Sequence, residues 1–283
     1  MLEPTVTPRP SVVALAASIA LSGVLLAGCE LDPTAPAAEV APEASPAPVV
    51  TMAPAAPLDR AGLLAAMDAA ASSYAGGEGG GDASLVGRRF LVRQAFGCAP
   101  NPTDDPQATG QEGIARATRT ADGRSLRLSL TPGDWAGSSL VSDSADAGWE
   151  VVEGIWLTRP WMRTEGCSAV PVSGATGDLA PLLQPQTMGL ASVFETDGSR
   201  VGRRNGRAFE YTLRGEEDEP VIAPPQGFRL VLEGRLEAFP DGRAIRCHSP
   251  ARDARPLCIA AIQVDRVSFE DAAGTTLSDW SRG

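Results

Sequence analysis

The chain of 283 residues contains no lysine; all 24 of its Lys and Arg positions are arginine. Walker-type phosphate loops, Schiff-base chemistry and Ser-Lys dyads each need a lysine side chain, so the sequence excludes them. It has a single histidine, His248, and contains neither G-x-S-x-G nor H-E-x-x-H. The usual signatures of α/β-hydrolases and zinc proteases are therefore missing.

Positive charge is also scarce overall, since the formal net charge is −11. Proteins that bind nucleic acid or dock on anionic membranes through basic segments rely on an excess of Lys and Arg. We therefore expect no nucleic-acid partner and no polybasic membrane contact.

Long apolar runs are absent apart from residues 12–26. A run of about fifteen residues is short for a membrane span, which needs roughly 20, and is typical of a signal-peptide core. The run ends in Leu26-Ala27-Gly28-Cys29, which resembles the lipobox of bacterial lipoproteins. The resemblance implies cleavage before Cys29, lipidation of that cysteine and a firm membrane anchor. Glu30 follows where an Asp would imply inner-membrane retention, so the resemblance further implies a lipid anchor in the outer membrane, facing the periplasm.

The rest of the chain divides by composition. After a signal peptide over residues 1–28, residues 29–57 are rich in Pro and Ala and predict a disordered tether. Residues 58–82 predict a short helix, capped by Asp59 and ended by a Gly-rich joint. The helix could either pack on the main domain or stay with the tether.

Residues 83–283 predict an all-β periplasmic domain. Alternation of apolar and polar residues is clear in SLRLSL and FEYTL, and further strand-like runs are RRFLVRQAF, WEVVEGIWL, GLASVFE, FRLVLEGRLEAF and CIAAIQVDRVSF. Asp-Gly and Asn-Gly dipeptides beside these runs are typical of tight turns. We expect an antiparallel β-sandwich or a partly open barrel.

Four cysteines remain once Cys29 is assigned to the lipid anchor, and an even number in an exported chain favours disulfides. Three pairings are possible. Cys247 and Cys258 flank a ten-residue loop between two strand-like segments, where a hairpin would bring them face to face. We therefore expect Cys247–Cys258, which leaves Cys98–Cys167.

His248 raises two alternatives for this loop, a zinc site or a cysteine nucleophile with a histidine base. Both need His248 and Cys247 to point at the same centre, whereas adjacent residues on a strand point to opposite faces. The loop is better interpreted as a stapled hairpin, and we predict neither a metal nor a cofactor. The acidic stretches SDSADAGWE (142–150) and GEEDEP (215–220) do not fit a calcium-binding loop; Ala145 stands at a ligand position in the first.

A possible ligand surface is indicated by two groups of residues. Trp156 and Trp161 could form a stacking platform, and Arg203 and Arg204 belong to the arginine-rich SRVGRRNGR, whose guanidinium groups suit phosphates or carboxylates. Lipid A phosphates and cell-wall peptides are periplasmic ligands of that chemistry. Core packing of the tryptophans and a charged hairpin tip are the alternatives.

The sequence thus predicts a lipid-anchored envelope protein that acts as a non-catalytic binding or structural module, with an envelope component or a protein as partner. The alternative is a cell-envelope hydrolase with paired carboxylates, since such acids come from distant segments without a local signature. Its candidate acids are Glu150, Glu153, Glu233 and Glu237.

Overall fold

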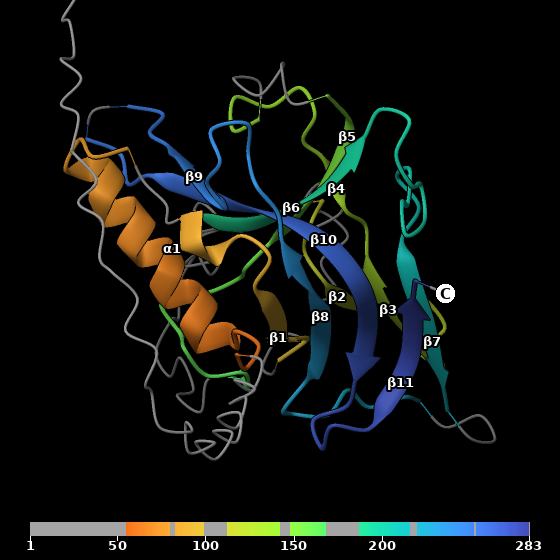
Figure 1. Ribbon diagram of the computed structural model, residues 1–283. Helices are drawn as coiled ribbons and strands as arrows, with labels where there is room; N and C mark the ends of the chain where they lie inside the picture. Colours follow the sequence, from red (N-terminus) through yellow and green to blue (C-terminus); the bar gives the residue numbers. More distant parts are fainter. Residues whose placement is uncertain are drawn as a thin grey trace, which may run out of the picture. The chain divides into compact units, whose positions relative to one another are not determined.

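The computed structural model describes residues 55–79, 83–98, 112–141, 148–167, 187–215, 220–251 and 253–282, all within one compact unit (Figure 1). A single α-helix, α1 (Arg60–Ala75), precedes the 3₁₀ turn η1 (Ala83–Leu85) and the strands of the described part. The strands are β1 (Arg89–Phe96), β2 (Arg116–Arg119), β3 (Ser125–Leu130), β4 (Gly133–Asp134), β5 (Trp149–Trp156), β6 (Met188–Glu195), β7 (Phe209–Arg214), β8 (Phe228–Leu236), β9 (Ile245–His248), β10 (Leu257–Glu270) and β11 (Thr276–Ser281).

The long strand β10 organises an eight-stranded sheet. Its first half pairs with β9 on one edge and with β6 on the other, and its second half pairs with β8 and β11. The change of partners occurs around Ile262, and a register irregularity follows between Val264 and Arg266. Because such bulges bend a strand and increase its twist, β10 can belong to two half-sheets with different orientations.

The second sheet has three strands in the order β2-β3-β7. In Figure 1, β2 and β3 lie behind β8 and β10, and β7 lies beside β11 at the right. Leu126, Leu128 and Leu130 of β3 are buried, whereas Arg127 between them is exposed. The inward leucines join the main hydrophobic core together with residues of the larger sheet. Over the residues that the structure describes, the fold is therefore mostly β, with two sheets and no closed barrel, which confirms the expected fold class. One pair, β6 with β10, is parallel.

Helix α1 packs against β1, β9 and β10. The Asp59 side chain accepts a hydrogen bond from the Gly62 amide at 2.7 Å, as an N-cap does. Leu63, Leu64 and Met67 are fully buried and belong to the main core. The structure thus answers the question that the sequence left open, since the helix packs on the β-domain.

A second, smaller core lies around Trp135 on β5 and β6. The indole occupies a niche that two glycines create. A methyl group at Gly154 would stand 1.9 Å from Trp135 Cε2, and one at Gly189 would stand 2.5 Å from Cη2. Any larger residue would displace the ring. Because both positions are glycine, the indole can lie directly on the backbone of the sheet.

Candidate binding surface

An exposed tryptophan stands on a tight turn after β5. The Met162 amide donates to the Arg159 carbonyl oxygen at 2.9 Å and closes the turn over residues 159–162. Pro160 occupies the second position, where its fixed φ favours such turns. Trp161 is 56% exposed, whereas every other aromatic residue in the described part of the chain is buried or half-buried. We call residues 159–162 the Trp161 turn.

The first residue of this turn is conformationally strained. Arg159 has φ = 51°, a left-handed conformation that costs energy for a residue with a Cβ. Proline as the next residue further restricts the backbone of Arg159 and normally favours an extended conformation. Such a conformation persists only where surrounding contacts enforce it.

Buried Arg60 supplies those contacts from the first turn of α1. Its Nη2 donates to the carbonyl oxygens of Thr158 at 2.7 Å and Arg159 at 3.1 Å, and its Nε donates to the carbonyl oxygen of Met162 at 3.1 Å. The residue is only 3% exposed. Loss of solvation lowers the pKa of Arg60 to about 10, with the nearby Arg159 charge as the second cause. The guanidinium therefore remains charged at neutral pH and fixes the backbone on both sides of Trp161.

Gln94 of β1 completes this network. It is 2% exposed, and its Oε1 accepts hydrogen bonds from the Thr158 amide at 2.9 Å and from Arg60 Nη1 at 3.4 Å. Its Nε2 donates to the Trp156 carbonyl oxygen at 3.3 Å. The turn is thus bonded to α1, and the residues just before it are bonded to β1, so the shape of this segment is set before any ligand arrives.

Positive charge flanks the turn. The side chains of Arg163 and Arg255 are 43% and 59% exposed, and both form ion pairs with the single carboxylate of Asp68. Arg60 and Arg159 add two more charges, which Glu165 partly offsets through its interaction with Arg60. The exposed guanidinium groups of Arg163 and Arg255 suit an anionic ligand.

The other residues predicted for a ligand surface lie elsewhere. Trp156 is half-buried, and its ring centroid lies 4.6 Å from that of Trp135. Arg203 bonds to Glu150 near the opposite end of β5. At about 3.4 Å per strand residue, the two ends of β5 are roughly 20 Å apart. The structure therefore does not bring Trp156 and the arginine-rich segment into one surface.

Arg203 serves mainly to hold its own segment. Its Nη1 pairs with Glu150 Oε1 at 3.2 Å, and Arg200 Nη2 pairs with Glu150 Oε2 at the same distance. Only 16% of the Arg203 side chain is exposed. Arg203 is therefore tied to an acid of β5.

Arg204 is engaged in the same way. Its guanidinium lies 4.4 Å from the ring centroid of Phe209 and donates to the Ala208 carbonyl oxygen. Burial lowers its pKa, with the Arg207 charge as the second cause. Buried Glu153 accepts the amides of Arg204 at 2.8 Å and Asn205 at 2.7 Å. These contacts show that the Arg204 side chain stabilises its own turn around Asn205 and Gly206, far from the Trp161 turn.

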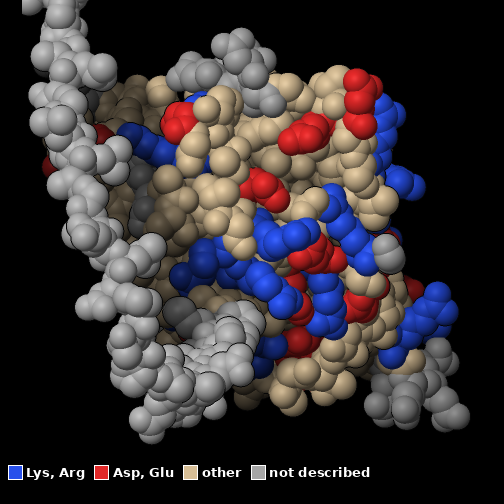
Figure 2. All heavy atoms as spheres, viewed as in Figure 1, with Lys and Arg blue, Asp and Glu red and all other residues tan. Residues whose placement is uncertain are grey.

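The outer face of β1, β8, β10 and β11 carries interleaved arginines and acids (Figure 2). Glu233 accepts from Arg266 at 2.7 Å, and Arg266 also bonds to Asp279. Arg93 pairs with Glu270 at 3.3 Å. Of the four candidate acids of the hydrolase alternative, Glu150, Glu153 and Glu233 are thus held by described partners.

Glu237 differs, because it lines a hollow of about 160 Å³. Burial raises its pKa, and Glu195 on the same hollow adds to the rise while Arg235 opposes it. The hollow lies near the place where β10 changes partners, and its further lining residues are Trp149, Val193, Phe194, Gly198, Ser199, Ala238, Gln263 and Arg282. Ligand pockets usually measure about 300–1,000 Å³, so this hollow is smaller than a typical ligand site.

The cysteines pair as the hairpin argument predicts, Cys247 with Cys258 and Cys98 with Cys167. Cys247 and Cys258 face each other across β9 and β10 and are 8% and 0% exposed. Two disulfides indicate an extracytoplasmic protein, because reducing compartments disfavour them. In the described segments, no three His, Cys, Asp or Glu side chains are placed to share a metal ion. The lipidation residue Cys29 lies outside the described residues.

No known protein family, curated protein or solved structure matches the chain. Among the described residues, no helix is long and apolar enough to cross a membrane.

The residues that build the Trp161 turn were missed from the sequence. Arg60 and Gln94 stand in unremarkable contexts, and Arg60 reaches partners 98 to 102 residues away. The only local signal was RPWMR itself, in which proline beside tryptophan predicts a turn bearing an aromatic side chain.

Proposed function

We propose that this protein is a non-catalytic binding module, held at the outer membrane by lipidated Cys29, which binds an anionic envelope component through the Trp161 turn. The observation that carries the proposal is the 56% exposure of Trp161 on a backbone fixed by the buried Arg60. Burying a charged group costs desolvation energy. Here the buried guanidinium fixes the backbone that carries an exposed aromatic side chain.

Preordering matters because association is opposed by the entropy lost when loops and side chains become fixed. Tryptophan and arginine dominate the energetics of many interfaces, since both combine a large apolar surface with a polar group. Trp161 beside Arg163 and Arg255 matches a ligand with an apolar or sugar face and phosphate or carboxylate groups.

The anchoring part of the proposal rests on Leu26-Ala27-Gly28-Cys29 and on the extracytoplasmic location that the disulfides indicate. Its test is membrane fractionation of the full chain and a Cys29→Ala variant, together with metabolic labelling by a fatty acid. We expect label and membrane retention in the wild type and neither in the variant. Equal retention of both proteins would refute the anchor.

The binding part is tested by co-sedimentation with two probes, purified peptidoglycan sacculi and vesicles containing lipid A. Trp161→Ala should weaken binding to the active probe at least about tenfold, as expected for an interface tryptophan. Ile222→Ala is the matched control, because Ile222 is an 81% exposed apolar residue outside the turn. Added salt should weaken binding, since the arginines contribute by charge. Equal loss in both variants, or no binding to either probe, would refute the proposed ligand class.

The hydrolase alternative now rests on Glu195 and Glu237, because Glu237 carries the raised pKa expected of a proton donor. Its test is hydrolysis of envelope glycans by the wild type and by Glu237→Gln. Release of sugar fragments that the variant abolishes would establish an enzyme and displace the binding proposal.

A further inference from the structure

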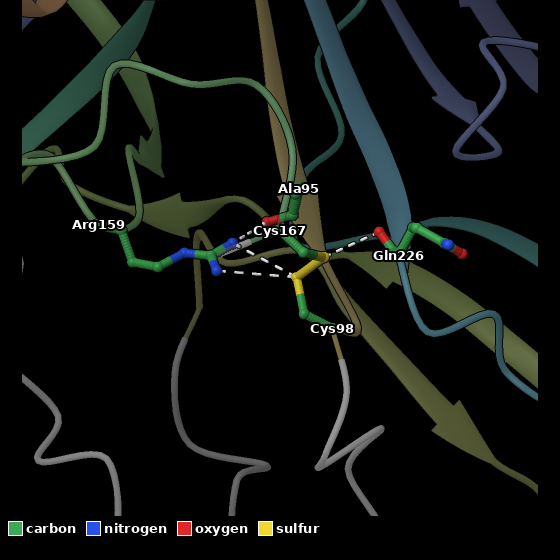
Figure 3. Close-up of a disulfide and its surroundings, with 5 residues drawn as sticks. All are labelled: Ala95, Cys98, Arg159, Cys167 and Gln226. Carbon is green, nitrogen blue, oxygen red and sulfur yellow. Dashed lines mark hydrogen bonds between the residues drawn. A yellow bond between two sulfur atoms is a disulfide. The ribbon is translucent and has the colours of Figure 1, made fainter. Parts of the chain in front are cut away.

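The two disulfides have different surroundings. Cys247–Cys258 is buried within the hairpin of β9 and β10. Cys98 and Cys167 are half-buried, and polar groups from two other segments approach their sulfur atoms (Figure 3). Access and the stability of the departing thiolate govern how fast a disulfide exchanges with a thiol, so these surroundings decide which bond is reactive.

Cys98 has a guanidinium beside its sulfur. Both Nη atoms of Arg159 lie 3.7 Å from Cys98 Sγ, and Nη2 also donates to the Ala95 carbonyl oxygen at 2.7 Å (Figure 3). Partial burial lowers the pKa of Arg159, and the group still carries its charge at neutral pH. A fixed positive charge at this distance stabilises a thiolate on Cys98, as it does at reactive cysteines in general.

Cys167 has a carbonyl oxygen beside its sulfur instead. The Gln226 oxygen lies 2.8 Å from Cys167 Sγ. A disulfide sulfur has no hydrogen to donate, so in the oxidised protein this is a close contact. After reduction, the Cys167 thiol can donate its hydrogen to this oxygen, whereas a thiolate there would be repelled by it. The two sulfurs are therefore unequal, with Cys98 favoured as thiolate and Cys167 as neutral thiol.

We propose that Cys98–Cys167 is a thiol–disulfide exchange site whose substrate is the thiolate of a small thiol or of a partner protein's cysteine. The incoming thiolate attacks Cys167 Sγ and forms a mixed disulfide. The Cys98–Cys167 bond breaks, and its electron pair stays on Cys98 Sγ beside Arg159. A second thiolate then attacks the sulfur of the first, releasing the external disulfide. Cys167 leaves as a thiolate and takes a proton from solvent. Two thiols are oxidised to one disulfide, and the protein disulfide is reduced by the same two electrons.

The exchange leaves the rest of the fold connected. Arg159 of the Trp161 turn contacts Cys98 through its side chain only, and the backbone of the turn stays bonded to Arg60. The Thr158 amide before the turn stays bonded to Gln94. The buried Cys247–Cys258 pair continues to join β9 to β10. Reduction of the exchange site is therefore a local event, and it can be measured on the folded protein.

The first test treats the folded, oxidised protein with reduced glutathione at pH 7, followed by alkylation and mass spectrometry. We expect Cys98–Cys167 to open at least about tenfold faster than Cys247–Cys258, with trapped glutathione on Cys167 and free thiol on Cys98. Equal opening of both disulfides, or glutathione mainly on Cys98, would overturn the proposal.

The second test addresses Arg159 directly. Arg159→Gln should slow the opening of Cys98–Cys167 by about threefold to tenfold, because the leaving thiolate loses its cation. Arg200→Gln, which removes an exposed arginine paired with Glu150, should leave the rate unchanged. An unchanged rate in Arg159→Gln would refute the role of the guanidinium.

A third measurement needs no variant and remains decisive if Arg159→Gln does not fold. In the reduced wild-type protein, the alkylation rates of both cysteines are followed against pH. Cys98 should titrate at least about one unit below the ordinary thiol value of roughly 8.5 and below Cys167. Cys98 titrating at or above Cys167 contradicts the assignment. Binding to sacculi or lipid A is independent of these readouts, so either proposal can fail alone.

Discussion

Replacing Arg60 by methionine removes the charged donor that orders the Trp161 turn while keeping an unbranched side chain of helix-forming character. In the native protein this guanidinium bonds to three backbone carbonyls and to Gln94 Oε1. Methionine can bond to none of them. The carbonyls of Thr158 and Arg159 would then be left without this donor, beside a backbone that is already strained at Arg159.

The magnitude follows from two opposing effects. Hydrogen bonds to a charged group contribute about 1.5–3 kcal/mol each to stability, and a buried acceptor left without a hydrogen bond costs about 1–3 kcal/mol. Against this, the variant no longer buries a charge, which returns part of the desolvation cost of a residue that is 3% exposed. Since the strongest contact is the one at 2.7 Å to Thr158, we expect a net loss of about 3 kcal/mol in the free energy of unfolding.

The assay is equilibrium urea unfolding at pH 7 with both disulfides intact, combined with hydrogen exchange of residues 158–163. Arg200→Met is the matched control, since the Arg200 side chain is 69% exposed and its ion pair with Glu150 should contribute less than about 1 kcal/mol. A loss below about 1 kcal/mol in Arg60→Met, or unchanged exchange at residues 158–163, would refute the role given to Arg60.

Two further predictions concern packing and charge. Gly154→Ala should destabilise the fold by about 1–3 kcal/mol and change the near-ultraviolet circular dichroism, because the new methyl group overlaps the Trp135 ring. Gly137→Ala, where the added carbon meets nothing within 4 Å, should be near neutral. Glu237→Gln should raise the melting temperature at pH 7, because burial raises the pKa of Glu237 and its ionised form therefore costs stability above the ordinary value of 4.5. That gain should vanish as the pH falls below 4.5, and a gain that persisted there would contradict the reasoning.

Much of the fold follows from local patterns. Alternation in SLRLSL predicted a strand with three inward leucines, and Leu126, Leu128 and Leu130 are buried in β3. The cysteine pairing followed from the hairpin around residues 247–258, because facing positions of paired strands bring side chains together. Such signals need only a few neighbouring residues, and a single sequence contains them.

Other parts of the fold have no such signal. Strand β4 has two residues and β2 has four, too few for a periodic pattern. Strand β10 pairs with β6 along its first half and with β8 along its second half. This change depends on which strands compete for its edges, and the alternation of apolar and polar residues along β10 carries no information about that. The Asp-Gly and Asn-Gly dipeptides were predicted to form tight turns between strands. Among them, Asp122-Gly123 joins two strands that pair with each other, β2 and β3.

The candidate site was predictable in part. Trp161 was predicted as part of a ligand surface, but Trp156, Arg203 and Arg204 were grouped with it although they lie in other environments. The grouping fails because tryptophan and arginine serve packing and ion pairs as readily as binding. What distinguishes Trp161 is its exposure on a turn held by Arg60, which depends on contacts between α1 and a segment about a hundred residues away.

The central claim is that the Trp161 turn is the surface through which this protein meets its envelope ligand. It is tested most directly by photo-crosslinking in intact cells, with a benzophenone amino acid placed at position 161 in one protein and at position 222 in another. We predict a discrete crosslinked product from position 161 that is absent from position 222 and is reduced when Arg163 is also replaced by glutamine. Crosslinks of the same kind from both positions, or none from position 161, would contradict it.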